Sequence, residues 1–123
     1  MVFLNTILVV DDDPALCHTL ALVLNREGYA VTTALHPYQA LQSLRVEAYN
    51  LVFLDIKLPD IDGLTLLSQI RRLRPDTAVL ILTAHATPQL KAEALQLGAR
   101  VCLSKPANPV DILAHVRAIL VEP

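Results

Sequence analysis

Glycine is scarce in this sequence, occurring only three times among 123 residues, at positions 28, 63 and 98. Loops that cradle nucleotide phosphates need closely spaced glycines, because a backbone without Cβ atoms can approach the phosphate oxygens. The chain contains neither a G-x-G-x-x-G nor a Walker sequence. We therefore exclude nucleotide binding through a glycine-rich loop.

Cysteine pairs, basic runs and long apolar segments are also missing. Cys17 and Cys102 lack the spacing of metal ligands, and a chain that is 54% hydrophobic can fold without a disulfide, so both are predicted to be reduced. Ten Lys and Arg against twelve Asp and Glu give a net charge of −2, which argues against direct nucleic-acid binding. No apolar run approaches the ~20 residues that span a bilayer, and the first residues do not show a basic region followed by an apolar one and a small-residue cleavage site. We expect one soluble, cytoplasmic domain without membrane contacts.

Five short segments are rich in β-branched and aliphatic residues and are predicted to be strands. Continuous apolar runs of this kind are typical of parallel strands that are covered on both faces. The stretches between and after them carry apolar residues at helical spacing. This alternation predicts a single α/β domain. The expected strands are 6–10, 29–34, 50–54, 78–82 and 100–104.

A candidate capping residue followed by proline marks four of the five predicted helix starts. Proline is favoured at the first helical position, where its missing N–H costs nothing. Gly28 and Gly98 each follow the last periodic residue of a helix and are predicted to adopt a left-handed conformation there. Histidine is the weakest of the four caps. The pairs are Asp13-Pro14, His36-Pro37, Thr87-Pro88 and Asn108-Pro109.

Chemically useful side chains follow the predicted strands. In an open parallel sheet the binding crevice lies beyond the carboxyl ends of the strands. Asp13 is explained as a helix cap, but the remaining three carboxylates repel each other and need a cation. Together with one lysine they sum to −2, which one Mg²⁺ would neutralise, and their hard oxygens suit that ion and an incoming phosphoryl group. The predicted set is Asp11, Asp12, Asp55, Thr83 and Lys105.

Four segments, "LVVDDD", "LDIKLPDIDG", "LTAHA" and "LSKPA", resemble the signatures of bacterial response-regulator receiver domains. They occur in the family's order and are spread over essentially the whole chain. The resemblance implies a receiver domain over residues 1–123 with a flavodoxin-like (βα)5 fold. Its doubly wound, five-stranded parallel sheet would have the order 2-1-3-4-5. It also implies a switch in a two-component phosphorelay rather than a turnover enzyme.

The resemblance assigns the acceptor and the metal ligands. Asp55 would take a phosphoryl group from a sensor histidine kinase or a histidine phosphotransfer protein, forming an acyl phosphate. Asp11 and Asp12 would hold Mg²⁺ together with Asp55 and the backbone carbonyl of Lys57. Phosphoryl transfer needs mainly positioning and charge neutralisation, which this set supplies.

Other positions would act on the phosphoryl group once it is attached. Lys105 would pair with its oxygens, and Thr83 would hydrogen-bond to one of them. In the family the positions of Lys57 and His85 influence hydrolysis. Because Lys57 can only donate hydrogen bonds, it could shield the group from water, and we predict slow dephosphorylation. The bond between Lys105 and Pro106 is the candidate for a cis peptide.

The fifth strand departs from the family pattern. Cys102 stands where the family has Tyr or Phe, whose ring turns inward when the threonine is drawn to the phosphoryl group, so coupling to Thr83 is in doubt. A redox-sensing thiol is an alternative, although a small buried core cysteine is favoured. Ala107 also replaces a common Phe. Both changes reduce the aromatic content of segments 87–120, where the family contacts partners and where phosphorylation is expected to alter binding.

Three alternative interpretations were weighed. "DIDGLT" resembles the motif of haloacid-dehalogenase-type phosphatases, which would make Asp60 the nucleophile. However, the apolar strand stops at Asp55, and Asp60 and Asp62 are better explained as turn and helix-start residues around Gly63. A flavodoxin-type cofactor binder would need a phosphate loop where this chain has aspartates. A histidine relay or metal site is disfavoured because the histidines are scattered, with only His85 beside the predicted site.

No output domain is recognised within residues 1–123, so the chain is expected either to stand alone or to be part of a longer regulator. A downstream output domain or protein is therefore a possible partner. The oligomeric state is left open between a monomer and a phosphorylation-dependent dimer.

Overall fold

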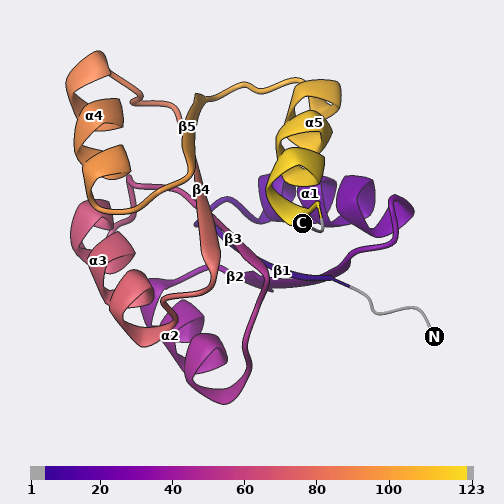
Figure 1. The fold of residues 1–123 in the computed structure, drawn as a ribbon, viewed down its shortest axis with the longest axis horizontal. Coiled ribbons are helices and arrows are strands. Elements are labelled where there is room, and N and C mark those ends of the chain that lie inside the picture. Colours follow the sequence, from indigo (N-terminus) through magenta and orange to yellow (C-terminus); the bar gives the residue numbers. More distant parts are fainter. Residues whose placement is uncertain (1–4, 122–123) are drawn as a thin grey trace.

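The structure is a computed structural model that describes residues 5–121, and in it a five-stranded parallel sheet is flanked by five helices (Figure 1). The strand order β2-β1-β3-β4-β5 confirms the predicted flavodoxin-like topology. The strands are β1 (Thr6–Val10), β2 (Ala30–Ala34), β3 (Leu51–Leu54), β4 (Ala78–Thr83) and β5 (Val101–Ser104). The helices are α1 (Pro14–Arg26), α2 (Pro37–Val46), α3 (Gly63–Leu73), α4 (Pro88–Gln96) and α5 (Pro109–Leu120).

Helices cover both faces of the sheet, which explains why its central strands are apolar throughout. Figure 1 shows α1 and α5 on one side and α2, α3 and α4 on the other. Alternate strand residues face opposite layers, so that Ile7 packs with α1 and α5, whereas Leu8 packs with α2 and α3. The edge strand β2 is the exception, because its Thr32 and Thr33 are exposed.

The predicted helix starts are confirmed, and they differ in quality. Proline begins α1, α2, α4 and α5. The side chains of Asp13, Thr87 and Asn108 each accept a hydrogen bond from a backbone N–H in the first turn. His36 makes no such bond, as its weak capping character predicts.

Other local expectations are also confirmed. Gly28 and Gly98 have φ angles of 93° and 103°, and the Lys105–Pro106 peptide bond is cis. The first predicted strand matches β1, and each of the other four differs from the observed strand by one residue at one end. Thr83 is the last residue of β4 rather than the residue after it. None of the helices in residues 5–121 is long and apolar enough to cross a membrane.

Candidate functional site

The predicted site residues lie together at the carboxyl end of the sheet, where backbone hydrogen bonds extend the strand pairing by one residue. The N–H of Asp11 donates to the carbonyl of Ala34 at 3.1 Å, and the N–H of Asp55 donates to Val10 at 3.0 Å. The N–H of Lys105 donates to Thr83 at 2.8 Å. These bonds fix the backbone of the three charged residues to the neighbouring strands.

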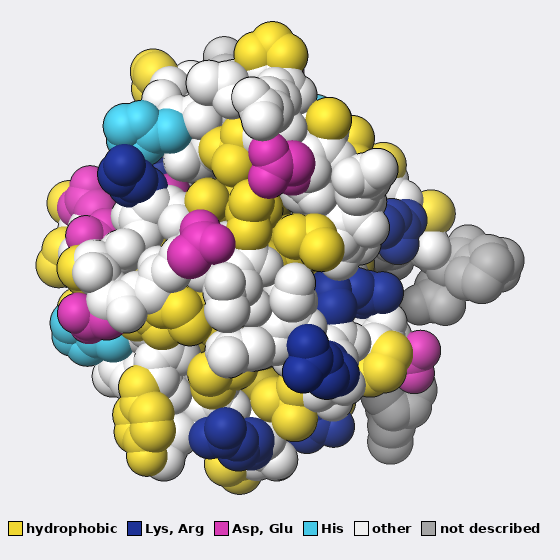
Figure 2. Space-filling view, turned by 90° about the vertical axis from the view of Figure 1, so that its left-hand side faces the viewer, with side chains coloured by type: hydrophobic (Ala, Val, Ile, Leu, Met, Phe, Trp, Pro, Cys, Tyr) yellow, Lys and Arg dark blue, Asp and Glu magenta, His cyan; other side chains and the backbone are white. Residues whose placement is uncertain are grey.

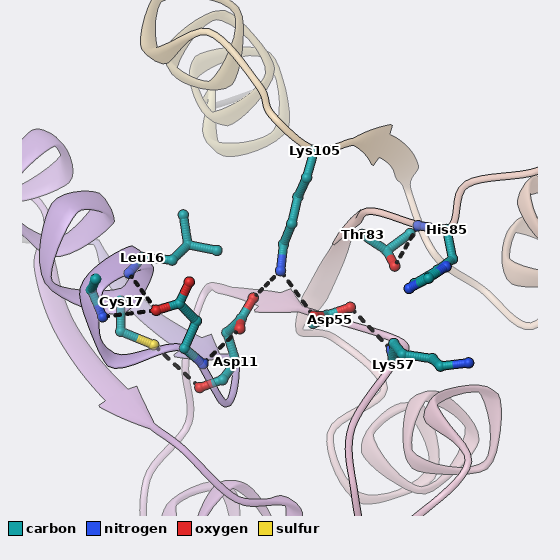
Figure 3. Close-up of polar contacts among 10 residues, drawn as sticks. Asp11, Leu16, Cys17, Asp55, Lys57, Thr83, His85 and Lys105 are labelled. Atoms are coloured by element: carbon teal, nitrogen blue, oxygen red, sulfur yellow. Dashed lines mark hydrogen bonds and ion pairs between the residues drawn. The ribbon is translucent and has the colours of Figure 1, made fainter.

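The ammonium of Lys105 lies between two carboxylates (Figure 3). Its Nζ is 2.6 Å from Oδ2 of Asp11 and 2.9 Å from Oδ2 of Asp55. Asp11 and Asp55 are buried, with 3% and 6% of their surfaces exposed. Two buried carboxylates need a counter-charge, and the lysine that follows β5 supplies it.

Burial and pairing act in opposite directions on the ionisation of this group. Burial raises the pKa of Asp11, although hydrogen bonds from Lys105 and from the N–H of Asp13 oppose the rise. Burial also lowers the pKa of Lys105, but its hydrogen bonds to the two carboxylates outweigh burial and leave that pKa above its ordinary value. The lysine is therefore held as a cation, while Asp11 is a carboxylate that gains from any further positive charge.

Three carboxylates converge on one point. One side-chain oxygen each from Asp11, Asp12 and Asp55 lies within 4.8 Å of the others. Asp12 is exposed, whereas the other two are buried, so the group opens toward solvent on one side. Hard oxygen donors with an open side suit Mg²⁺, which keeps several of its own waters. The residues present therefore fit the predicted metal.

Backbone N–H groups fix the orientation of the remaining carboxylate oxygens. Oδ1 of Asp11 accepts from the N–H of Asp13 at 3.0 Å. Oδ1 of Asp55 accepts from the N–H of Lys57 at 3.0 Å. The hydroxyl oxygen of Thr83, which is fully buried, accepts from the N–H of His85 at 3.2 Å. Each side chain is thus aimed by the loop that follows its own strand.

The loop after β3 folds back on itself through an isolated antiparallel bridge between Lys57 and Asp62. Gly63 follows this loop directly, and its Cα lies unusually close to the backbone of Ile56. A Cβ at Gly63 would lie 2.1 Å from the carbonyl oxygen of Ile56, so only glycine fits. Asp60 lies exposed in this loop and outside the carboxylate group. Asp62 precedes α3, as predicted for a helix-start residue.

A groove of about 590 Å³ lies beside the carboxylates. The loop from Ile56 to Asp62 forms one wall, and Thr83, His85 and Leu90 line the other. Lys57 and His85 are both exposed. In Figure 3 the side chain of Lys57 extends away from Lys105 and Asp11, and the ring of His85 lies on the same side of Asp55.

Sequence reasoning missed two features of this site. It assigned Lys105 to the phosphoryl group and did not foresee that its ammonium bridges Asp11 and Asp55. It also missed Cys17, whose Sγ lies 3.4 Å from the backbone oxygen of Asp11. The signal was available, because Cys17 faces the sheet in the first turn of the helix that follows Asp11. Burial raises the pKa of Cys17 to about 11, with the nearby carboxylates adding to the rise.

Cys102 lies on the central part of β5 and packs in the cluster formed by α2, α3 and α4. It is 8% exposed, and burial raises the pKa of its thiol. This environment matches the favoured prediction of a small core cysteine, because an activated thiol has a lowered pKa.

Comparisons with known proteins agree with this geometry. A family model described as the response regulator receiver domain matches residues 7–117. A transcriptional regulatory protein CpxR homolog of Haemophilus influenzae is 38% identical over 95% of this chain, which covers 51% of that protein. The chain spans about half the length of the first curated relatives that it matches.

Two solved structures show the same fold. A CheY-like response regulator receiver domain protein from Methanospirillum hungatei is 35% identical and has a TM-score of 0.91, with 94% of this chain and 93% of that chain covered. A response regulator protein from Burkholderia pseudomallei is 34% identical with a TM-score of 0.84, with 93% of this chain and 71% of that one covered. The second structure is described as containing a phosphorylated aspartic acid, a calcium ion and citrate.

Proposed function

Because this chain belongs to the response-regulator receiver family of two-component systems, we propose that it is a Mg²⁺-dependent switch whose phosphoryl acceptor is Asp55. The observation that carries this proposal is the placement of the Asp55 carboxylate. It is buried, aimed by the N–H of Lys57, and paired with the ammonium of Lys105. A partner kinase or phosphotransfer protein would present a phosphohistidine at the groove beside it.

The transfer itself needs an ionised and correctly aimed acceptor. An oxygen of Asp55 attacks the phosphorus, the P–N bond to the donor histidine breaks, and an acyl phosphate forms. The ammonium of Lys105 is within reach of the new group and would move from the carboxylates to its oxygens. Asp11, Asp12, Asp55 and the backbone carbonyl of Lys57 would hold Mg²⁺, which supplies the charge neutralisation that lets an anionic phosphoryl group approach.

The phosphorylated state would be sensed by the loop after β4. The Thr83 hydroxyl oxygen is buried and accepts from the N–H of His85, which leaves its O–H group to donate to a phosphoryl oxygen while the loop after β4 stays attached to it. Segments 87–120 include α4, β5 and α5, and we propose that this face changes its partner binding. Because Cys102 occupies the middle of β5, movement of the β4–α4 loop rather than rotation of an aromatic ring would transmit the change.

Phosphorylation by a small donor tests the proposal. With acetyl phosphate and Mg²⁺, intact-mass measurement should show one added phosphoryl group on the native chain and none on Asp55→Asn. The Asp60→Asn variant is the matched control, because Asp60 belongs to the same loop but lies outside the carboxylate group. Uptake that persists in Asp55→Asn and is lost in Asp60→Asn would refute the proposal and favour the phosphatase interpretation.

A further inference from the structure

Five arginines from distant parts of the sequence meet on one surface, which we call the arginine face. They lie at the carboxyl ends of α2 and α3 and in the loop between α4 and β5, at the opposite end of the sheet from Asp55. Figure 2 shows most of the basic side chains of this view gathered on its lower right. The five are Arg45, Arg71, Arg72, Arg74 and Arg100.

Hydrogen bonds join the elements of this face. Arg74 donates from Nε to the carbonyl of Leu44 at 2.7 Å, which ties the end of α3 to the end of α2. Arg71 donates to the carbonyl of Thr77 at 2.7 Å, and its side chain lies against Gly98 after α4. These two arginines have a structural role, because Arg74 satisfies a carbonyl in the last turn of α2 and Arg71 satisfies the carbonyl that precedes β4.

The other three arginines have no such role. Arg45, Arg72 and Arg100 are exposed, and within residues 5–121 their own guanidinium groups make no ion pair and donate no hydrogen bond, although the carbonyl of Arg45 accepts from Arg74 at 3.4 Å. Attraction to helix carboxyl ends explains why basic residues are tolerated here, but that attraction is weak at exposed sites. Three unpaired guanidinium groups in one area leave a strong local field for an anionic partner.

Apolar side chains accompany the arginines. Val46 is 86% exposed, and Leu73 and Leu97 are 37% and 39% exposed. A groove of about 370 Å³ between α2 and α3 has aliphatic and guanidinium walls. All the basic residues here are arginines, while the three lysines of the chain lie elsewhere, and arginine with apolar side chains is the composition that protein interfaces favour over lysine. The groove is lined by Leu41, Arg45, Gln69, Arg72 and Leu73.

Gln69 lines this groove with a side-chain amide. Within residues 5–121 its Oε1 is the buried side-chain oxygen that has no hydrogen-bond donor. Because this oxygen is buried, a peptide N–H would reach it only after the Gln69 side chain turns toward the groove. A phosphate backbone offers only acceptors, and the chain as a whole carries a net charge of −2. The groove therefore matches a protein segment better than a nucleic acid.

We propose that the arginine face is a docking surface for an acidic protein segment, in which an aliphatic side chain enters the α2–α3 groove and flanking carboxylates pair with Arg45 and Arg72. The α2–α3 groove is separate from the phosphorylation site and from segments 87–120, and only the edge of the arginine face, at Arg100, lies within that range. Binding there does not require Asp55 to be phosphorylated.

The test uses a short synthetic helical peptide that carries leucines one turn apart, flanked by glutamates. We expect it to shift the amide NMR signals of ¹⁵N-labelled protein around Leu41, Gln69 and Leu73. The double variant Arg45→Glu with Arg72→Glu should weaken binding about tenfold or more. Peptides with Glu→Gln or Leu→Ser changes should bind more weakly than the parent peptide.

Two controls make the result decisive. Arg26→Glu makes the same type of charge change at the same end of the sheet, but on α1 and therefore on the other face, and should leave peptide binding unchanged. The double variant should still accept a phosphoryl group from acetyl phosphate, which shows that it is folded. Equal weakening by Arg26→Glu, signal shifts away from the groove, or tighter binding of a short DNA duplex than of the peptide would overturn the proposal.

Discussion

The glycine at position 63 controls how closely α3 approaches the end of β3. An added Cβ would meet backbone atoms of Ile56 at 2.1–2.5 Å, and those atoms cannot move without displacing Lys57. We expect Gly63→Ala to reduce the free energy of unfolding by about 3 kcal/mol or more and to slow phosphorylation sharply. Denaturant unfolding and acetyl phosphate uptake measure the two effects.

Gly28→Ala is the matched control for this prediction. Gly28 has a φ of 93°, but nothing lies within 4 Å of the position that its Cβ would take. The cost should be limited to backbone strain of about 1–2 kcal/mol, with phosphorylation unchanged. Equal loss of phosphoryl uptake in both variants would show that Gly63 acts through stability alone.

Lys57 is the residue that we expect to set the lifetime of the phosphorylated state. An acyl phosphate is hydrolysed when water approaches opposite the aspartyl oxygen, and a long cationic side chain attracted to the phosphoryl oxygens would block that approach. In the unphosphorylated structure Lys57 is exposed and extends away from Lys105, so it is free to turn inward (Figure 3). We predict faster loss of the phosphoryl group in Lys57→Asn than in the native chain, followed by intact mass over time. Unchanged or slower loss would contradict shielding.

At the scale of elements, the start of α2 is a place where a better cap would stabilise the fold. His36 has the extended backbone of a capping residue, with φ −136° and ψ 149°, but makes no side-chain cap hydrogen bond. We expect His36→Asn to raise the free energy of unfolding by about 1 kcal/mol, and Thr87→Ala to lower it by about 1 kcal/mol through loss of an existing cap. Urea unfolding gives both values. A loss of stability in His36→Asn would mean that the imidazole contributes packing that outweighs the missing cap.

The elements were predictable from sequence because each carries its own local signal. Proline after a cap located four helix starts, and apolar runs located the strands to within one residue. The convergence of Asp11, Asp55 and Lys105 followed from their places at strand ends. The arginine face had no such signal, because the bond between Arg74 and Leu44 joins residues 30 positions apart. The bridging position of Lys105 was missed for a similar reason, since side-chain distances do not follow from strand order.

At the scale of the whole molecule, charge is separated along the strand direction. Six of the seven arginines lie in the last turn of a helix or just after one, and Arg100 directly precedes β5, while Asp11, Asp12, Asp55, Asp60 and Asp62 lie at the other end. The parallel fold causes this, because every helix ends on the side of the sheet opposite the functional site. The small net charge of −2 is therefore the sum of a mainly acidic end and a mainly basic end of the molecule.

The proposed Mg²⁺ site would make the stability of the whole domain depend on the ion. An ion held by Asp11, Asp12 and Asp55 would bind only the folded chain, in which these residues converge, because the unfolded chain has no such group. The free energy of unfolding should therefore rise by about 1.4 kcal/mol when the Mg²⁺ concentration is ten times its Kd, and the thermal unfolding midpoint should rise with it. Asp12→Ala should remove most of this gain. Asp13→Ala should keep it while losing about 1 kcal/mol through the α1 cap.

Low pH should remove the gain in the free energy of unfolding that Mg²⁺ gives, because protonation of Asp11 competes with binding of the ion. Burial raises the pKa of Asp11. Its uncharged form therefore stabilises the fold at pH values below 3.8, the ordinary pKa of this group. This contribution is lost as the pH rises through the pKa of Asp11 in the folded state. Mg²⁺ offsets that loss because it favours the carboxylate. Protons therefore compete with the ion at a higher pH than they would at an exposed carboxyl. Unfolding midpoints measured from neutral to acidic pH, with and without Mg²⁺, should converge as pH falls. A gain that stays constant into acid, or one that Asp11→Asn leaves intact, would show that Mg²⁺ binds away from these carboxylates.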